Sequence, residues 1–396
     1  GYTVNTSTGV VTFSSAPSAP SVAGQDNVTI EYAKTVTGYA DKINKCRFMG
    51  LFGLGGMGSD RIFFSGNPDS PNVDWHCDIA APDYEVDPSY IPDTSYAHIG
   101  SPENPIMGYR RLGSYQLIIK GQNDQDASVF QRSAALDTEG NTMFGIEQGA
   151  AGIGAESMHC FANLADEPLF LSKQGIFGIY STNVLSITAL QNRSYFVDKL
   201  LTAESNLDKA VGAEWNGYYV LCVNNRAYVL DGRQRKQYNE KSGSAYVYEC
   251  YYWTNIPAVC MREVDGTLYF GTTEGLFCRF NTDISDSTKY NDNGAAIDAF
   301  WSTRLDDDGS TLLYKTTKKI GITMKPNTLS SVKVYVTTQK NSFALANTFT
   351  YDSFDFSDID FADFSFMTGG VVQTVPLRCK VKKYISLQIT ARNDIR

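Results

Sequence analysis

The sequence predicts an all-β protein, and three observations indicate this class. The chain of 396 residues is rich in aromatic residues that favour strands, with 24 Tyr and 22 Phe. It also carries 33 Gly, which supply turns, and long Leu/Ala/Glu/Lys runs of helical period are scarce. Most importantly, one phrase recurs along the chain: a turn, a short apolar strand, a second turn and another short strand.

The recurring phrase has one anchor residue in its first strand, and the anchors follow one another at intervals of about 50 residues. The anchors are Ile62, Leu117, Leu169, Tyr219 and Leu268, and a looser sixth copy surrounds Ile320. Several short strands per period are typical of β-propeller blades, because stacked sheets cover the faces that one sheet alone leaves open. We therefore expect a β-propeller of six blades, with five or seven as alternatives, and an inner strand just before each anchor.

The segments on either side of the repeats have a different character. Residues 1–37 contain YTVNTSTGVVTF and NVTIEYAKTV, which predict a small N-terminal β-hairpin element with its turn at Ser7-Thr8-Gly9, the end of a truncated domain. Residues 38–300 are assigned to the propeller blades. Residues 301–396 are expected to form a C-terminal β segment that supplies the last blade or the closure, plus an aromatic and acidic arm, FDFSDIDFADFSF.

The stretch GLGGMG, residues 53–58, matches the glycine pattern of dinucleotide-binding loops. That pattern needs a strand before it and a helix after it, because the helix N-terminus holds the pyrophosphate. Here the next residues, RIFFS, predict a second strand and are broken at once by Gly66-Asn67-Pro68. The sequence therefore indicates a glycine-rich hairpin loop and not a nucleotide site.

Metal-binding residue types are sparse. The segment DWHCD, Asp74 to Asp78, combines carboxylates, an imidazole and a thiol, but the chain has only three His. Its eight Cys stand singly in apolar runs without a C-x-x-C pair, which indicates reduced core thiols of a protein made in a reducing cytoplasm. We expect no metal and no cofactor. No segment has the pattern of a signal peptide or a membrane span, so we also expect no membrane insertion.

The formal net charge of -9 excludes a surface that is attractive to nucleic acid as a whole. Lysines nevertheless gather late in the chain, where two strands could lie side by side. They form the candidate phosphate-contacting patch of Lys315, Lys318, Lys319, Lys380, Lys382 and Lys383, for which a solvated face is the alternative. The aromatic arm is a candidate protein interface through Phe354, Phe356, Phe361 and Phe364, since exposed phenylalanines are costly unless covered.

Catalytic motifs give little support to an enzyme. The segment LDDDGSTLLY, residues 305–314, weakly resembles the Asp-box turns of sialidase propellers, but it occurs once and lacks their Trp. Sialidase chemistry also needs an arginine cluster with a Tyr nucleophile and a carboxyl acid. The candidates for the arginine cluster are Arg110, Arg111 and Arg304, and nothing in their spacing supports such a cluster. There is no G-x-S-x-G elbow of a serine hydrolase. The sequence predicts a protein that is not an enzyme.

Several phrases of the repeats resemble a known family. They are GYADKINKCRFMGLFG, RIFFSGNP with VDW, LGSYQLIIK followed by SVF, and LFLSKQGIFGI, and together they span about residues 2–300. In combination they are similar to the tail hub, nozzle or DNA stabilisation proteins of tailed bacteriophages. The resemblance implies a β-propeller around the tail channel, present as a homo-oligomeric ring below the portal or adaptor and in contact with other tail proteins.

The same resemblance implies a mechanical role. Such a protein would be made in the cytoplasm of the host bacterium, sit in the virion, extend the portal and retain packaged DNA until ejection. An acidic wall would suit a channel in which DNA slides, because a basic wall would bind each phosphate. The alternative is a glycan-binding or glycosidase-type propeller that acts at the host cell surface, since this fold serves enzymes and scaffolds alike.

Overall fold

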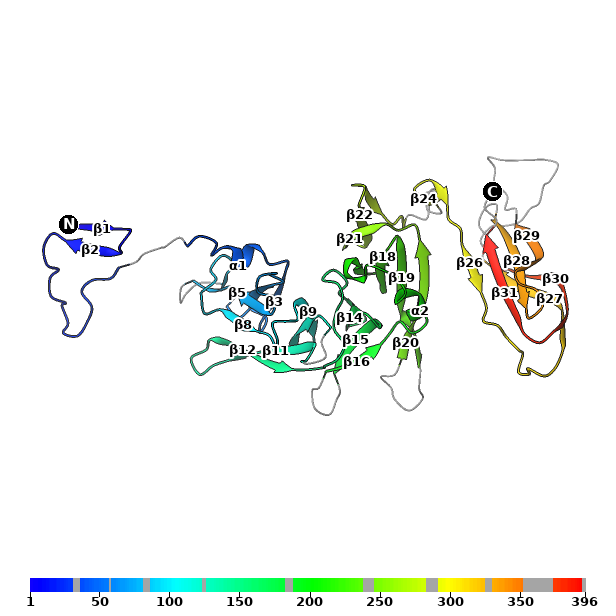
Figure 1. Cartoon of the computed structure of the whole chain (residues 1–396), viewed down its shortest axis with the longest axis horizontal. Helices are drawn as coiled ribbons and strands as arrows, with labels where there is room; N and C mark the ends of the chain where they lie inside the picture. Colours follow the sequence, from blue (N-terminus) through cyan, green and yellow to red (C-terminus); the bar gives the residue numbers. More distant parts are fainter. Residues whose placement is uncertain are drawn as a thin grey trace. The chain divides into compact units, whose positions relative to one another are not determined.

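The computed structural model describes residues 1–30, 36–56, 58–80, 86–122, 126–181, 188–237, 246–282, 291–324, 330–351 and 373–393. The chain divides into two compact units, residues 1–279 and residues 280–396. Strands dominate both of them (Figure 1). The described helices are short: α1 (Asp41–Asn44), α2 (Asp198–Leu201) and a 3₁₀ turn, η1 (Leu207–Lys209). None of the described helices has the length and apolar character needed to cross a membrane.

The first unit begins with a small hairpin of β1 (Tyr2–Asn5) and β2 (Val10–Phe13). The Asn5 side chain accepts hydrogen bonds from the backbone N–H groups of Ser7 and Thr8, and Gly9 has a φ of +72°. The predicted turn at Ser7-Thr8-Gly9 is therefore confirmed. Of the second predicted strand, residues 28–30 are irregular, and residues 31–35 lie outside the described part of the chain.

Five antiparallel sheets follow in chain order, and each is an up-and-down meander. The first consists of β3 (Phe48–Phe52), β4 (Arg61–Ser65), β5 (Val73–His76) and β8 (Tyr96–His98), with the hairpin β6 (Asp78–Ile79) and β7 (Val86–Asp87) inserted. The second consists of β9 (Ile106–Leu112), β10 (Tyr115–Lys120), β11 (Val129–Leu136) and β12 (Thr142–Gln148). The third consists of β13 (Ala162–Leu164), β14 (Glu167–Ser172), β15 (Gly175–Ser181) and β16 (Thr188–Asn192).

The fourth sheet consists of β17 (Val211–Trp215), β18 (Tyr218–Val223), β19 (Arg226–Gln237) and β20 (Tyr246–Thr254). In the fifth, three strands are described: β21 (Ala258–Val264), β22 (Thr267–Thr272) and β23 (Phe277–Arg279). Every one of the five predicted anchors lies in the second strand of its sheet, and the strand before it is the first. The all-β class and the propeller blades are thus confirmed.

Packing between sheets explains the apolar runs at the anchors. In β10, Ile118 packs in a cluster with Phe52 and Phe63 of the first sheet. Its neighbours Leu117 and Ile119 pack on the other face, in a cluster shared with the third and fourth sheets. A strand that is buried on both faces reads as a continuous apolar run and not as an alternation, which is the pattern of QLIIK.

Glycines in the first strands let neighbouring sheets approach closely. A Cβ atom at Gly50 would lie 2.9 Å from the Tyr109 ring, and one at Gly108 would lie 2.7 Å from the Phe161 ring. Both aromatic rings come from the next blade along the chain. The recurring Met-Gly of RFMGLF and PIMGYRR therefore marks the contact between blades, where a side chain would prevent packing.

The GLGGMG stretch connects β3 to β4, as predicted. The two strands pair in antiparallel register, and the Asp60 carboxylate accepts a hydrogen bond from the Gly55 N–H at 2.8 Å. A Cβ atom at Gly53 would lie 2.4 Å from the same carboxylate. Glycine is required here so that the loop can fold onto Asp60.

The second unit has a different architecture. Its strands are β24 (Asn291–Asp292), β25 (Ala295–Ala296), β26 (Phe300–Ser302), β27 (Lys315–Met324), β28 (Ser330–Thr338), β29 (Ala344–Tyr351), β30 (Gln373–Tyr384) and β31 (Leu387–Asn393). One sheet has the order β26-β31-β28-β29, and a second pairs β27 with β30. The two sheets enclose a core of Ile320, Val334, Val336 and Cys379.

The number of blades is not confirmed. The predicted sixth copy falls on β27 and β28, which belong to different sheets, so this segment is not a meander like the other five. The physical reason is that β27 pairs with β30, far along the chain, in preference to its neighbour. The structure also divides the chain at residues 279 and 280, before the boundary predicted at residue 300.

The cysteines are all free thiols, and four of the eight are buried: Cys77, Cys160, Cys222 and Cys379. Burial raises the pKa of the Cys160 thiol to about 11 and that of the Cys222 thiol to about 12. These groups are therefore protonated core side chains at neutral pH. Cys260 is exposed, so the prediction of core thiols is wrong for this residue.

The contact between blades predicts that Gly108→Ala destabilises the first unit by about 1–3 kcal/mol, because the new methyl group overlaps the Phe161 ring. The measurement is hydrogen exchange of the β9 and β10 amides at increasing urea concentrations. Gly121→Ala is the matched control, since its Cβ would make an ordinary contact, 3.6 Å from Pro105. Equal losses of protection in the two variants would contradict the packing argument.

Candidate functional site

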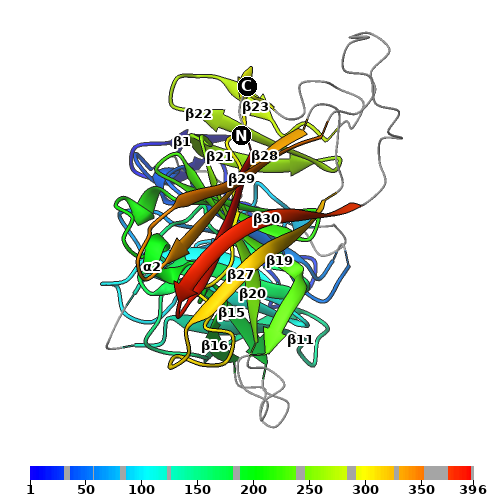
Figure 2. The same cartoon turned by 90° about the vertical axis from the view of Figure 1, so that its right-hand side faces the viewer.

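The predicted lysine patch lies on the pairing of β27 with β30, which Figure 2 shows side by side. Lys319 is directly opposite Arg378, and Thr316 is opposite Lys382. Residues that face each other across an antiparallel pair point to the same side of the sheet. The expectation that the strands carrying these lysines are neighbours is therefore confirmed.

Alternation along β30 separates the core from the charges. Cys379 is buried and Val381 is half-buried against the core of the second unit. The residues that alternate with them, Arg378, Lys380 and Lys382, are exposed. We call the exposed set the basic face. It consists of Lys318, Lys319, Arg378, Lys380, Lys382 and Lys383.

The basic face carries charges that the protein itself does not neutralise. In the described part of the chain, none of its six side chains forms an ion pair with a carboxylate. Six exposed cations on one pair of strands in an otherwise acidic chain produce a local positive potential. Such a surface can contact phosphate groups without reading a base sequence.

Lys315 is the exception among the predicted patch residues. Its ammonium group donates hydrogen bonds to the backbone carbonyls of Asp307, Ser310 and Ile385, at 2.6 Å for Ser310 and 3.1 Å for Ile385. The residue is half-buried and holds the turn of residues 306–310 against the end of β30. The Lys315 ammonium group is thus bound by backbone carbonyls of the protein itself. A phosphate-contacting role for the other five lysines stays a prediction.

Arg378 was missed by the sequence reasoning, although the signal was present. In LRCKVKK the cationic residues Arg378, Lys380 and Lys382 alternate with Cys379 and Val381, and Lys383 follows. This period of two is that of a strand with one charged and one buried face.

The side chains of the DWHCD segment contact other residues of the first unit. Asp74 makes a buried ion pair with Arg132, and Asp78 pairs with Arg61 at 2.9 Å. The His76 ring lies 5.3 Å from the Phe63 ring, and its Nδ1 is 3.0 Å from the Cys77 carbonyl oxygen. No group of three or more potential ligands is placed to hold a metal ion within the described ranges.

The arginines considered for a glycosidase serve other contacts or belong to different units. The Arg110 guanidinium donates to the Phe161 carbonyl and lies 5.3 Å from the centre of its ring, and burial lowers the Arg110 pKa. Arg111 bonds the Gly113 carbonyl at 3.1 Å, and Arg304 belongs to the other unit. The candidate arm of Phe354, Phe356, Phe361 and Phe364 lies outside the described residues.

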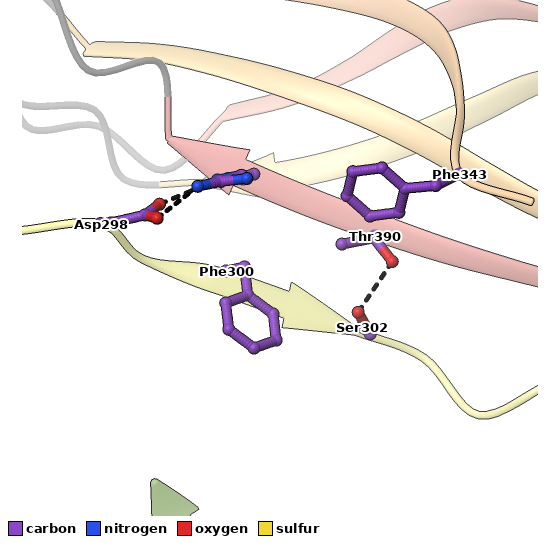
Figure 3. A pocket seen from close by; sticks show the side chains of 6 residues that line it. Asp298, Phe300, Ser302, Phe343 and Thr390 are labelled. Carbon is purple, nitrogen blue, oxygen red and sulfur yellow. Dashed lines mark hydrogen bonds and ion pairs between the residues drawn. The ribbon is translucent and has the colours of Figure 1, made fainter. Parts of the chain in front are cut away.

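A shallow pocket of about 270 Å³ opens beside β26 and β31 (Figure 3). Its polar side chains already bond one another: Arg392 Nε donates to Asp298 at 2.8 Å, and the Ser302 and Thr390 hydroxyls lie 2.7 Å apart. The hydrogen bonds from Arg392 hold the Asp298 pKa below its ordinary value. With its polar groups paired internally, the pocket offers a ligand mainly the exposed rings of Phe300 and Phe343.

Comparison with known proteins gives distant structural similarity to solved structures. No protein-family model and no curated protein matches the chain. Among solved structures, the chain is similar to a glycoside hydrolase family 43 arabinoxylan arabinofuranohydrolase from Bacillus subtilis, crystallised with cellotetraose. The identity is 9%, the alignment covers 87% of this chain and 75% of that one, and the TM-score is 0.24. A similarity at this level supports no statement about activity.

The position of Lys315 predicts that Lys315→Met loosens the turn of residues 306–310 and the start of β27. The variant leaves three carbonyls without their charged donor, at a cost of about 1–3 kcal/mol. Hydrogen exchange of amides 306–316 measures this local loss. Lys318→Met is the control, because Lys318 is exposed and has no such bonds in the described structure. Equal protection in both variants would show that Lys315 has no structural role.

Proposed function

We propose that this chain is a structural protein of a tailed-phage virion, part of the tail hub or nozzle below the portal, which retains packaged DNA until ejection. The observation that carries the proposal is the basic face, an unneutralised cationic surface on a chain of net charge -9. The resemblance of the blade phrases to tail proteins supports the same role. These phrases fall on the strands β3, β4, β10, β14 and β15, which build the cores of the first three blades.

Electrostatics explains how such a protein can hold DNA and still release it. Each lysine or arginine that neutralises a phosphate releases counterions and adds affinity, whatever the base sequence. The excess of acidic residues repels the duplex, so that binding would be confined to the basic face. A contact of a few charges is weak enough to yield when the tail opens.

The alternative is a glycan-binding or glycosidase-type propeller that acts at the host surface. Its requirement is a set of aromatic, arginine and paired carboxyl side chains around one ligand. The two roles differ in partners: a virion component binds the portal in a defined symmetry, whereas a glycan-active protein binds carbohydrate as a free chain.

Electron microscopy of the full-length protein with the portal ring of its own phage tests the structural role. We expect added density of matching symmetry at the narrow end of the portal. The protein alone, and the protein mixed with an unrelated portal, are the controls. A protein that stays monomeric and leaves the portal bare would overturn the proposal, and a glycan screen would then test the alternative.

Binding to duplex DNA tests the basic face separately. We expect Lys380→Gln combined with Lys382→Gln to weaken binding and to reduce the slope of log K against log salt by about 1.8, since each phosphate contact contributes about 0.9. Fluorescence anisotropy with one duplex at several salt concentrations measures both effects. Lys199→Gln combined with Lys209→Gln makes the same charge change at exposed positions in the other unit. Equal effects of the two double variants would rule out a specific role for this face.

A further inference from the structure

A second hollow, of about 230 Å³, lies between the first two blades. The first blade contributes Phe63, Asp74 and Tyr96 to its wall, and β11 and β12 of the second contribute Arg132, Thr142 and Phe144. The space is smaller than the pockets that take drug-sized molecules, and it suits a ligand of one small ring.

The floor of this hollow is a buried ion pair with two polar atoms left over. Asp74 and Arg132 are each 1% exposed and pair through Asp74 Oδ2. The Tyr109 hydroxyl donates to the same oxygen at 3.2 Å, and Arg132 Nη1 donates to Gln116 Oε1 at 2.6 Å. Asp74 Oδ1 and Arg132 Nε have no hydrogen-bond partner among the described residues.

These two atoms define the chemistry of a ligand. A buried polar atom without a partner is costly, so a group that satisfies it is bound favourably. Oδ1 accepts a hydrogen bond and Nε–H donates one, and a hydroxyl group can do both at once. Because the carboxylate and the guanidinium already neutralise each other, the ligand itself need carry no charge.

The walls add an apolar surface beside the polar floor. The rings of Phe63 and Phe144 meet edge to face at 5.0 Å, and the His76 ring lies 5.6 Å from Phe144. Arg132 lies over Phe63, with its guanidinium carbon 3.8 Å from the ring centre. A small molecule with hydroxyl groups on its edge and C–H groups on its face fits both kinds of surface.

We propose that this hollow binds one neutral sugar residue, with a hydroxyl group between Asp74 Oδ1 and Arg132 Nε and the ring against Phe144. The hollow belongs to the first unit, whereas the basic face belongs to the second. It is independent of the proposed tail role, so that failure of one leaves the other standing.

Ligand-observed saturation-transfer NMR of the full chain is the test, with D-glucose, D-galactose, N-acetyl-D-glucosamine and L-rhamnose as probes. We expect at least one sugar to receive saturation and to give a saturable titration. If none of the four does so at millimolar concentration, the proposal is wrong, and an ordered water molecule is the simpler partner of the two polar atoms.

Two variants locate the site without disturbing the ion pair. Thr142 lines the hollow and lies on the same face of β12 as Phe144, so Thr142→Trp should fill the space and weaken sugar binding about tenfold or more. Glu147→Trp places the same side chain at an exposed position of β12 outside the hollow and should bind like the wild type. Unchanged binding in Thr142→Trp, or equal losses in both variants, would place any sugar elsewhere and overturn the assignment.

Discussion

The first unit depends on one constraint: a four-stranded sheet has two faces, and each must be covered. A middle blade meets it by packing between two others, as β10 does with Ile118 on one side and Leu117 on the other. Neighbouring sheets must then approach closely, because the dispersion attraction between their side chains weakens steeply when a gap separates them. This is why Gly50 and Gly108 stand where the aromatic rings of the following blade arrive. The repeated apolar strands and glycines of the sequence correspond to these contacts between blades.

Polar groups buried at the contacts between blades fix how the sheets are aligned. At the contact of the third and fourth blades, Glu167 accepts both from Arg193 and from the hydroxyls of Tyr246 and Tyr248. At the contact of the first and second blades, Asp74 and Arg132 make the corresponding pair but keep one acceptor and one donor unused. A buried ion pair adds little net stability, yet breaking it is costly, so each pair opposes sliding of one sheet over the next. The difference between the two contacts is what makes the first a candidate binding site.

The sequence predicted what local pattern and period determine. Each anchor from Ile62 to Leu268 lies in the second strand of a blade, because burial on both faces leaves a continuous apolar run that can be read directly. The apolar run around Ile320 led to the prediction of a sixth blade, which the structure does not have there. In this segment β27 pairs with β30, which is distant in the sequence, and such a pairing leaves no local signal. Lys315 was placed with its neighbours by charge alone, but only the fold shows that carbonyl groups surround its ammonium. The unused atoms of Asp74 and Arg132 likewise depend on contacts between residues far apart in the sequence.

Because the chain forms two units with separate cores, the cations of the basic face are kept out of the blades. Six cations on one pair of strands repel one another and would destabilise a unit whose core depended on that surface. Here the basic face belongs to a two-stranded sheet whose opposite side packs in a core of its own, around Ile320 and Cys379. The blades therefore need not tolerate the charges, and the basic face need not take part in stacking. A basic surface of this kind can gain or lose lysines while Leu117, Leu169 and the glycines between blades stay fixed. Charge on the basic face and packing in the blades are thus separable properties of the chain, and each can be altered without loss of the other.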